Sequence, residues 1–142
     1  MNDTPQPAYP RPEPDPDSLP YWNALREGRV LVQRCAACGK AQLYFRAICR
    51  YCWSRDLTPE QASGTGTVYS YSVVHTVGDP ALAAEVPYAL AIVELNEGPR
   101  VMTRIEGDPE VVRIGDRVRA SFRDIGDDVT LLHFTREAAD AR

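Results

Sequence analysis

Residues 34–54 read RCAACGKAQLYFRAICRYCWS, and this stretch holds all of the cysteines of the chain: Cys35, Cys38, Cys49 and Cys52. Each C-x2-C pair forms a tight turn, and a hairpin that joins the two turns brings four sulfur atoms to one point. Gly39 follows the first pair, where such a turn needs a positive φ. Four thiolates suit a tetrahedral Zn²⁺ with no open coordination position. We therefore predict a structural zinc site that does not activate water.

Other uses of the four cysteines are less well supported. Iron in a rubredoxin-like site stays open as an alternative, because the four-thiolate geometry is the same. Redox-active C-x2-C pairs usually begin a helix in a thioredoxin-like fold, which this sequence does not resemble. Two disulfides are disfavoured because residues 1–20 lack the apolar core of a secretory signal. The chain also has no run of about 18 apolar residues, so we expect a cytoplasmic protein.

The composition divides the 142 residues into zones. Residues 1–20 hold seven of the twelve prolines and have little to bury, which is typical of a disordered or polyproline-like tail. Residues 21–62 carry a net charge of +4, whereas residues 63–142 carry −5. The expected organisation is a disordered tail over residues 1–18, a helix and zinc ribbon over residues 19–62, an OB-fold over residues 63–137 and a tail over residues 138–142.

A short helix is expected before the ribbon. Ser18 or Asp17 can cap it, and Pro20 is tolerated in its first turn. Tyr21, Trp22 and Leu25 lie three to four residues apart and form one apolar stripe. The sequence therefore predicts a helix that packs this stripe against the rest of the chain.

The acidic zone is rich in β-branched and aromatic residues, and turn sequences such as NEGP at residues 96–99 interrupt it. Strands are expected at residues 65–77, 88–95, 100–105, 117–123 and 129–135. Five strands with little helix suit a small closed barrel, and a barrel of the oligonucleotide- and oligosaccharide-binding (OB) type leaves few exposed edges. The predicted fold class is mostly β: an N-terminal helix and zinc ribbon followed by a five-stranded OB-fold barrel.

Catalytic patterns are absent from the sequence. The two histidines, His75 and His133, each lie in a predicted strand, where a structural role is expected. There is no nucleophile elbow, no Walker loop and no G-x-G-x-x-G. We therefore assign no catalytic residue and identify no cofactor-binding residue besides the four cysteines.

Several motifs occur in an order that resembles the DUF35 family. They are Tyr21-Trp22 in the helix, QRCAACGK at residues 33–40, Cys49 and Cys52, GTVYSYSVVH at residues 66–75, PYALAIVEL at residues 87–95, and IGDRV at residues 114–118. The resemblance covers residues 19–137. One departure is Arg46-Ala47-Ile48, where the family often has proline. This departure affects a loop and not the metal ligands.

The resemblance implies an N-terminal helix, a rubredoxin-like zinc ribbon and a C-terminal OB-fold. Family members commonly associate with thiolase-superfamily enzymes that act on coenzyme A (CoA) thioesters, including thiolases, acyltransferases and thiolase-like aldolases that shorten steroid side chains. In these assemblies the thiolase-like chain carries the chemistry, and the DUF35 chain stabilises it and assists in binding the CoA thioester. We therefore expect a non-catalytic accessory subunit in a hetero-oligomer, with no membrane partner.

A nucleic-acid-binding module is the alternative function. Zinc ribbons and OB-folds both occur in such proteins, and Tyr69 and Tyr71 could stack on bases. The net charge of −5 over residues 63–142 argues against it, because backbone binding needs a basic groove. The sequence leaves open whether five aromatic residues form a protein interface or pack the ribbon onto the barrel: Tyr21, Trp22, Tyr44, Phe45 and Trp53.

Overall fold

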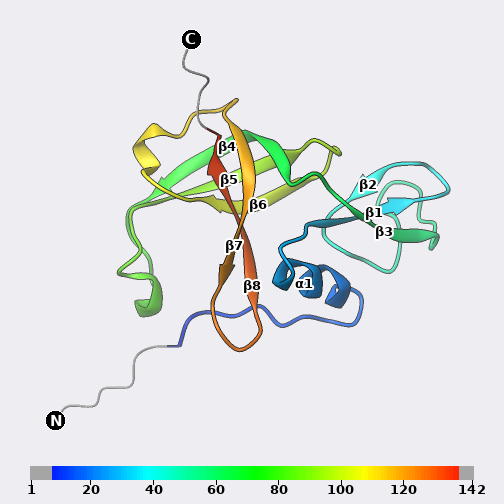
Figure 1. The fold of residues 1–142 in the computed structure, drawn as a ribbon, viewed down its shortest axis with the longest axis horizontal. Helices are drawn as coiled ribbons and strands as arrows, with labels where there is room; N and C mark the ends of the chain where they lie inside the picture. The colour runs from blue at the N-terminus through cyan, green and yellow to red at the C-terminus, as the bar shows by residue number, and fades with distance from the viewer. Residues whose placement is uncertain (1–7, 138–142) are drawn as a thin grey trace.

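The computed structural model describes residues 8–137, which form a helix, a small three-stranded sheet and a closed barrel (Figure 1). In the figure the three-stranded sheet lies at one end, the barrel lies at the other, and helix α1 lies between them. No helix within the described part of the chain is long and apolar enough to cross a membrane.

Helix α1 spans Leu19–Arg26 and has Pro20 in its first turn, where the missing N–H costs nothing. Ser18 is its N-cap residue, but the Ser18 side chain makes no capping hydrogen bond. The Ser18 N–H instead donates to Asp15 Oδ1 at 2.7 Å. Tyr21 and Leu25 of the predicted apolar stripe are buried, so the helix packs as expected.

The three-stranded sheet forms the ribbon. Its strands are β1 (Leu31–Cys35), β2 (Ala41–Gln42) and β3 (Leu57–Gln61), in the order β2-β1-β3. Both pairings are antiparallel. Strand β1 is central and mostly buried, whereas β3 is an exposed edge strand that contains a proline. Strand β1 therefore ends at the buried Cys35, the first residue of the first C-x2-C turn.

The barrel contains five strands in the order β4-β5-β6-β8-β7. The strands are β4 (Thr65–Val74), β5 (Tyr88–Leu95), β6 (Arg100–Ile105), β7 (Arg117–Asp124) and β8 (Thr130–Arg136), with short 3-10 turns η1 (Pro80–Leu82) and η2 (Pro109–Val111) between them. The β6–β8 contact is parallel and the other pairings are antiparallel. The predicted mostly-β fold is confirmed.

One glycine allows two barrel strands to approach closely. A Cβ atom on Gly66 of β4 would lie 2.5 Å from the Glu94 carbonyl oxygen of β5, so no side chain fits there. This glycine belongs to the GTGT segment at residues 64–67, which takes the chain from the ribbon into the barrel. Gly66 therefore lets β4 and β5 pair closely where the chain enters the barrel.

A single apolar core joins the ribbon, the helix and the barrel. Leu25 of α1, Val32 of β1 and Phe134 of β8 are each fully buried and belong to one contiguous cluster with the inward side chains of the other barrel strands. Along β5 the pattern alternates, with every second residue fully buried. The helix therefore packs the ribbon onto the barrel, and the two parts hold a fixed relation to one another.

Residues 8–18 fall within the segment expected to be disordered, yet they have specific contacts. The Tyr9 hydroxyl donates to Glu85 Oε2 at 3.3 Å, and Arg11 pairs with Asp127 of the β7–β8 hairpin at 3.0 Å. The segment runs past this hairpin before it enters α1 (Figure 1). The remainder of the predicted tail, residues 1–7, and the predicted tail at residues 138–142 lie outside the described residues.

Candidate metal centre and apolar groove

The four cysteine sulfurs converge as the spacing predicts. All four Sγ atoms lie within 4.8 Å of one another, with Cys35–Cys52 at 3.6 Å and Cys38–Cys49 at 3.7 Å. A regular tetrahedron of thiolates about 2.3 Å from a central Zn²⁺ has edges of about 3.8 Å. A disulfide would bring two sulfurs to about 2.05 Å, and all four cysteines are free. The donor set therefore fits one tetrahedral ion, and these four residues would hold it.

Two similar backbone turns present the sulfurs. The Gly39 N–H donates to the Cys35 carbonyl at 2.8 Å, and the Trp53 N–H donates to the Cys49 carbonyl at 2.9 Å. In each turn the residue after the second cysteine has a positive φ: 77° at Gly39 and 70° at Trp53. The positive φ predicted at Gly39 is confirmed, and the second turn repeats it with a tryptophan.

The four thiols lie close enough to affect one another's protonation. N–H donation, led by the Cys38 backbone, lowers the pKa of the Cys35 thiol. The pKa of Cys52 is raised to about 12, because desolvation and the neighbouring sulfurs outweigh the N–H that Ser54 donates to it. Four thiolates side by side repel one another unless a positive ion lies between them. A bound metal ion would therefore displace the remaining thiol protons.

Two buried glutamines, which the sequence analysis did not single out, hold the loop that carries the second cysteine pair. Gln33 is 7% exposed and Gln42 is 2% exposed, and Gln42 Nε2 donates to Gln33 Oε1 at 2.7 Å. Gln42 also accepts the Arg50 N–H at 2.8 Å and donates to the Ile48 carbonyl at 3.3 Å. These two bonds bracket Cys49, so Gln42 fixes the backbone on both sides of a ligand.

The metal centre has the features of a structural site. Cys35 and Cys49 are buried, Cys38 is intermediate and Cys52 is exposed. In residues 8–137 these cysteines form the only group of three or more histidine, cysteine or acidic side chains close enough to share an ion. Because four protein ligands complete a tetrahedral Zn²⁺, no position is left for a substrate.

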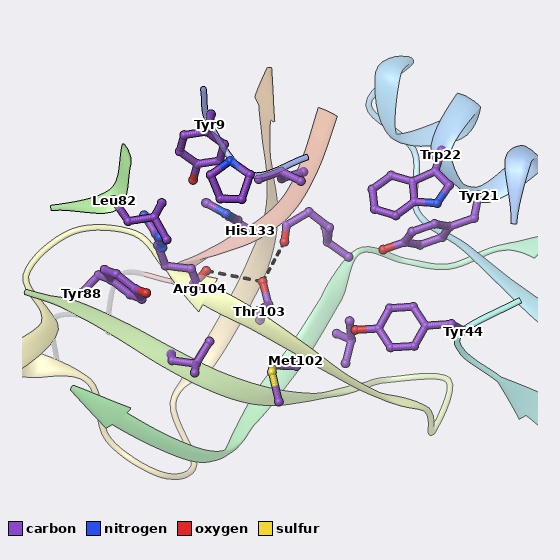
Figure 2. A pocket seen from close by; sticks show the side chains of 15 residues that line it. Tyr9, Tyr21, Trp22, Tyr44, Leu82, Tyr88, Met102, Thr103, Arg104 and His133 are labelled. Atoms are coloured by element: carbon purple, nitrogen blue, oxygen red, sulfur yellow. Dashed lines mark hydrogen bonds between the residues drawn. The ribbon is translucent and has the colours of Figure 1, made fainter. Parts of the chain in front are cut away.

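An apolar groove of about 340 Å³ lies between helix α1 and the barrel (Figure 2). Met102, Thr103 and Arg104 of β6 form its floor, and Tyr21, Trp22 and Tyr44 stand on one side of it. The rest of its lining comes from the N-terminal segment, the loop with η1, and strands β5, β6 and β8: Tyr9, Pro10, Leu82, Tyr88, Leu90, Val101, Leu131, Leu132 and His133. The groove is therefore built from segments far apart in the sequence.

A carboxylate binds two residues that line this groove, Tyr9 and Arg104. Glu85, in the loop after η1, pairs with Arg104 of β6 at 3.0 Å and with Arg123 of β7. The Arg104 guanidinium also lies 3.7 Å from the Tyr88 ring centroid. Burial raises the pKa of Glu85, but hydrogen bonds from the two arginines outweigh it and leave the pKa below its ordinary value of 4.5. Glu85 therefore stays ionised and ties the loop to the barrel.

Replacing Glu85 by glutamine is expected to lower stability by about 2 kcal/mol at pH 7, because two charge-assisted hydrogen bonds are weakened. A carboxyl group with a lowered pKa stabilises the fold above about pH 4.5 and loses this effect as the pH falls through its folded value. The E85Q variant should therefore show a weaker loss of stability between about pH 5 and 3. Urea unfolding at several pH values measures both effects. The control is Glu94→Gln, which breaks an exposed pair with Arg100 and should change little.

The two histidines have different environments. His133 is buried and pairs with Glu106, and burial lowers the pKa of its imidazole despite that carboxylate. The predicted structural role therefore fits His133. His75 is different: it is exposed and follows the last residue of β4, Val74, so its prediction as a strand residue is wrong.

Thr103, in the floor of the groove, has its hydroxyl group satisfied within the chain. This hydroxyl donates to the Leu132 carbonyl at 2.8 Å.

The five aromatic residues that the sequence left open divide into two groups. Tyr21 and Phe45 are buried and lie 5.9 Å apart between ring centroids. Trp22 packs edge-on against Tyr21 at 5.2 Å, so these three rings help to join helix and ribbon. In contrast, Tyr44 is 44% exposed at the groove and Trp53 is 77% exposed.

Comparison with known proteins gives two adjoining matches to family models. The model described as the ChsH2 rubredoxin-like zinc ribbon domain matches residues 22–58, and the ChsH2 C-terminal OB-fold domain matches residues 59–123. A solved structure titled "Ltp2-ChsH2(DUF35) aldolase" is 36% identical with a TM-score of 0.79, and the match covers 89% of this chain and 98% of that chain. The chain belongs to the DUF35 family. Its barrel is an OB-fold, and its ribbon is a zinc ribbon whose four cysteines support structural zinc.

Two curated relatives of this DUF35 chain have names that describe parts of larger systems. A DUF35 domain-containing scaffold protein of Methanocaldococcus jannaschii is 40% identical over 110 residues, which are 75% of this chain and 77% of the relative. A probable enoyl-CoA hydratase alpha subunit of Thermomonospora curvata is 37% identical over 128 residues, which are 89% of this chain. The chain spans only 40% of the length of that hydratase subunit.

Proposed function

We propose that this DUF35 chain is a non-catalytic accessory subunit of a thiolase-superfamily enzyme that acts on an acyl-CoA thioester. One observation carries the proposal: the family similarity spans both the barrel and the ribbon, and the four converging cysteines of the ribbon would leave a tetrahedral metal ion no open position for a substrate. A thiolase-like partner would supply the reacting groups. The names of its relatives, which describe a scaffold, a subunit and an aldolase assembly, agree with this role.

The groove beside α1 suits the acyl part of the thioester. Its volume of about 340 Å³ is near the lower end for small-molecule sites, and its lining is mainly aromatic and aliphatic. The arginine of its lining, Arg104, is already paired with Glu85 and is not free to bind phosphate. The groove would therefore contact an acyl group, and the partner would bind the nucleotide part of CoA.

Co-expression tests the accessory role. The chain and a thiolase-like protein encoded beside it should elute together as a hetero-oligomer, and the thiolase-like protein should lose solubility or thioester-cleaving activity without the DUF35 chain. The purified DUF35 chain should not turn over a thioester. A chain that cleaves an acyl-CoA by itself, or that ignores every thiolase-like neighbour, would contradict the proposal.

The finer assignments follow from the same role. Zinc is the proposed metal, with iron as the alternative, and a ferric tetrathiolate would colour the purified protein red whereas zinc leaves it colourless. A cytoplasmic location is proposed because four free thiols suit a reducing compartment. Nucleic-acid binding finds little support, since Arg100 already stacks on Tyr69 and pairs with Glu94 on the barrel surface.

A further inference from the structure

The second metal-binding turn contains a residue that its backbone does not favour. Gly39 and Trp53 occupy the same position in the two turns, with φ of 77° and 70°. A positive φ suits glycine, but it is uncommon for a bulky residue and costs about 1–2 kcal/mol. The indole is 77% exposed, so burial does not repay this cost. Residues held in strained conformations cluster at functional sites, which makes Trp53 a candidate for a contact outside the chain.

Three neighbours complete an exposed surface around this turn. Tyr51 lies between the last two cysteines and is 45% exposed. The Lys40 Nζ atom lies 4.7 Å from the Tyr51 ring centroid, and the Arg50 guanidinium lies 5.2 Å from it. We define Lys40, Arg50, Tyr51 and Trp53 as the knuckle patch. Aromatic residues and arginine are the residue types that most often anchor protein interfaces.

The charge around the knuckle patch is not neutralised within the described residues. Lys40, Arg46, Arg50 and Arg55 are all exposed and none has an ion pair there, although arginines elsewhere pair with carboxylates. A zinc ion held by four thiolates would carry a charge of −2, which together with the exposed Asp56 offsets three of these four cations. The remaining excess is positive, so the complementary surface is acidic.

The geometry points to the knuckle patch as a docking surface for the partner subunit. This inference rests on the proposed function. In the docked complex, Trp53 fills an apolar pocket of the thiolase-like chain, and carboxylates at the rim of that pocket pair with Lys40 and Arg50. A metal ion bound by the four cysteines would hold the turn before docking, so little conformational entropy would be lost on docking. A protein partner is favoured over nucleic acid because the chain as a whole carries a net charge of −4.

Substitution of Trp53 by glycine separates the docking role from a structural one. Glycine suits the positive φ, so Trp53→Gly should keep one metal ion per chain and a melting temperature at or above that of the wild type. Its affinity for the co-purified thiolase-like subunit, measured by titration calorimetry, should fall at least tenfold. Trp53→Asn provides a second variant, because asparagine also tolerates this conformation. The matched control is Ile114→Ala, a 69% exposed apolar residue on the barrel, which should bind as the wild type does.

Charge reversal tests whether Lys40 and Arg50 pair with carboxylates at the rim of the partner's pocket. Arg50→Glu combined with Lys40→Glu should weaken binding and reduce its dependence on salt concentration. Wild-type affinity in Trp53→Gly and Trp53→Asn would overturn the docking surface while leaving the accessory role intact. A wild-type chain that forms no complex would overturn both proposals. A salt-dependent gel shift of single-stranded RNA that Trp53→Gly abolishes would assign the patch to nucleic acid and overturn the protein partner.

Discussion

Replacement of Cys49 by serine is expected to abolish stable zinc binding and to unfold the ribbon. Cys49 is 1% exposed, and a serine hydroxyl does not replace the thiolate. Zinc binding by small four-ligand domains amounts to about 10–16 kcal/mol at pH 7, and in such domains it is folding free energy. The ribbon relies on it because β2 has only two residues and β3 is largely exposed.

Metal analysis and near-ultraviolet circular dichroism measure this effect. The wild type should contain one zinc per chain, whereas Cys49→Ser should contain close to none and should lose the signal from the buried rings of Tyr21 and Phe45. A chelator added to the wild type should give the same change. The control is Ala37→Ser, which places a hydroxyl at an exposed position between the first two cysteines. Full zinc content in Cys49→Ser would refute the assigned ligand set.

The barrel was predictable from the sequence because apolar burial forms it. Strands β5 (Tyr88–Leu95) and β6 (Arg100–Ile105) lie where they were expected, since both segments are mainly apolar, their burial alternates along the strand, and NEGP marks the hairpin. Strand β4 ends at Val74, earlier than expected, because the run of β-formers continues into the loop that leads to η1. Periodicity locates a strand better than it locates the end of one.

The short strands of the ribbon carry no such signal. Strand β3 (Leu57–Gln61) reads LTPEQ, and a proline among polar residues does not predict a strand. It forms because β1 offers an edge that the metal site and the core hold in place. The four ligands were predictable because a coordination geometry requires their spacing, whereas the supporting pair Gln33 and Gln42 follows no spacing rule.

The groove was not predictable from the sequence because it arises from packing between distant segments. Both Tyr9 of the N-terminal segment and Leu131 of strand β8 line it, although they are more than a hundred residues apart in the sequence. The unusual position of Trp53 can be recognised in the sequence, but only when the two cysteine turns are compared. The sequence shows CG at residues 38–39 and CW at residues 52–53, and only glycine suits the shared conformation without strain.

Replacement of Gln42 by leucine is the second change with a large expected effect. Leucine has a similar size but removes the partners of the Arg50 N–H and the Ile48 carbonyl, whereas Gln33 Oε1 keeps the N–H of Arg46. Each polar group left unsatisfied in a buried place costs about 1–3 kcal/mol. Because the first two groups flank Cys49, the loop would no longer hold this ligand in position.

We therefore expect Gln42→Leu to weaken zinc affinity by about 10–100-fold, as the loss of supporting groups does at other metal sites. Competition with a chromogenic chelator measures the affinity, and thermal unfolding of the zinc-bound chain measures the stability. The control is Gln61→Leu, which makes the same chemical change at an exposed position of β3 and should leave both quantities near wild type. If Gln42→Leu bound zinc as tightly as the Gln61 control, the cysteine turns would hold their geometry without the buried glutamines, and the ribbon would depend on its ligands alone.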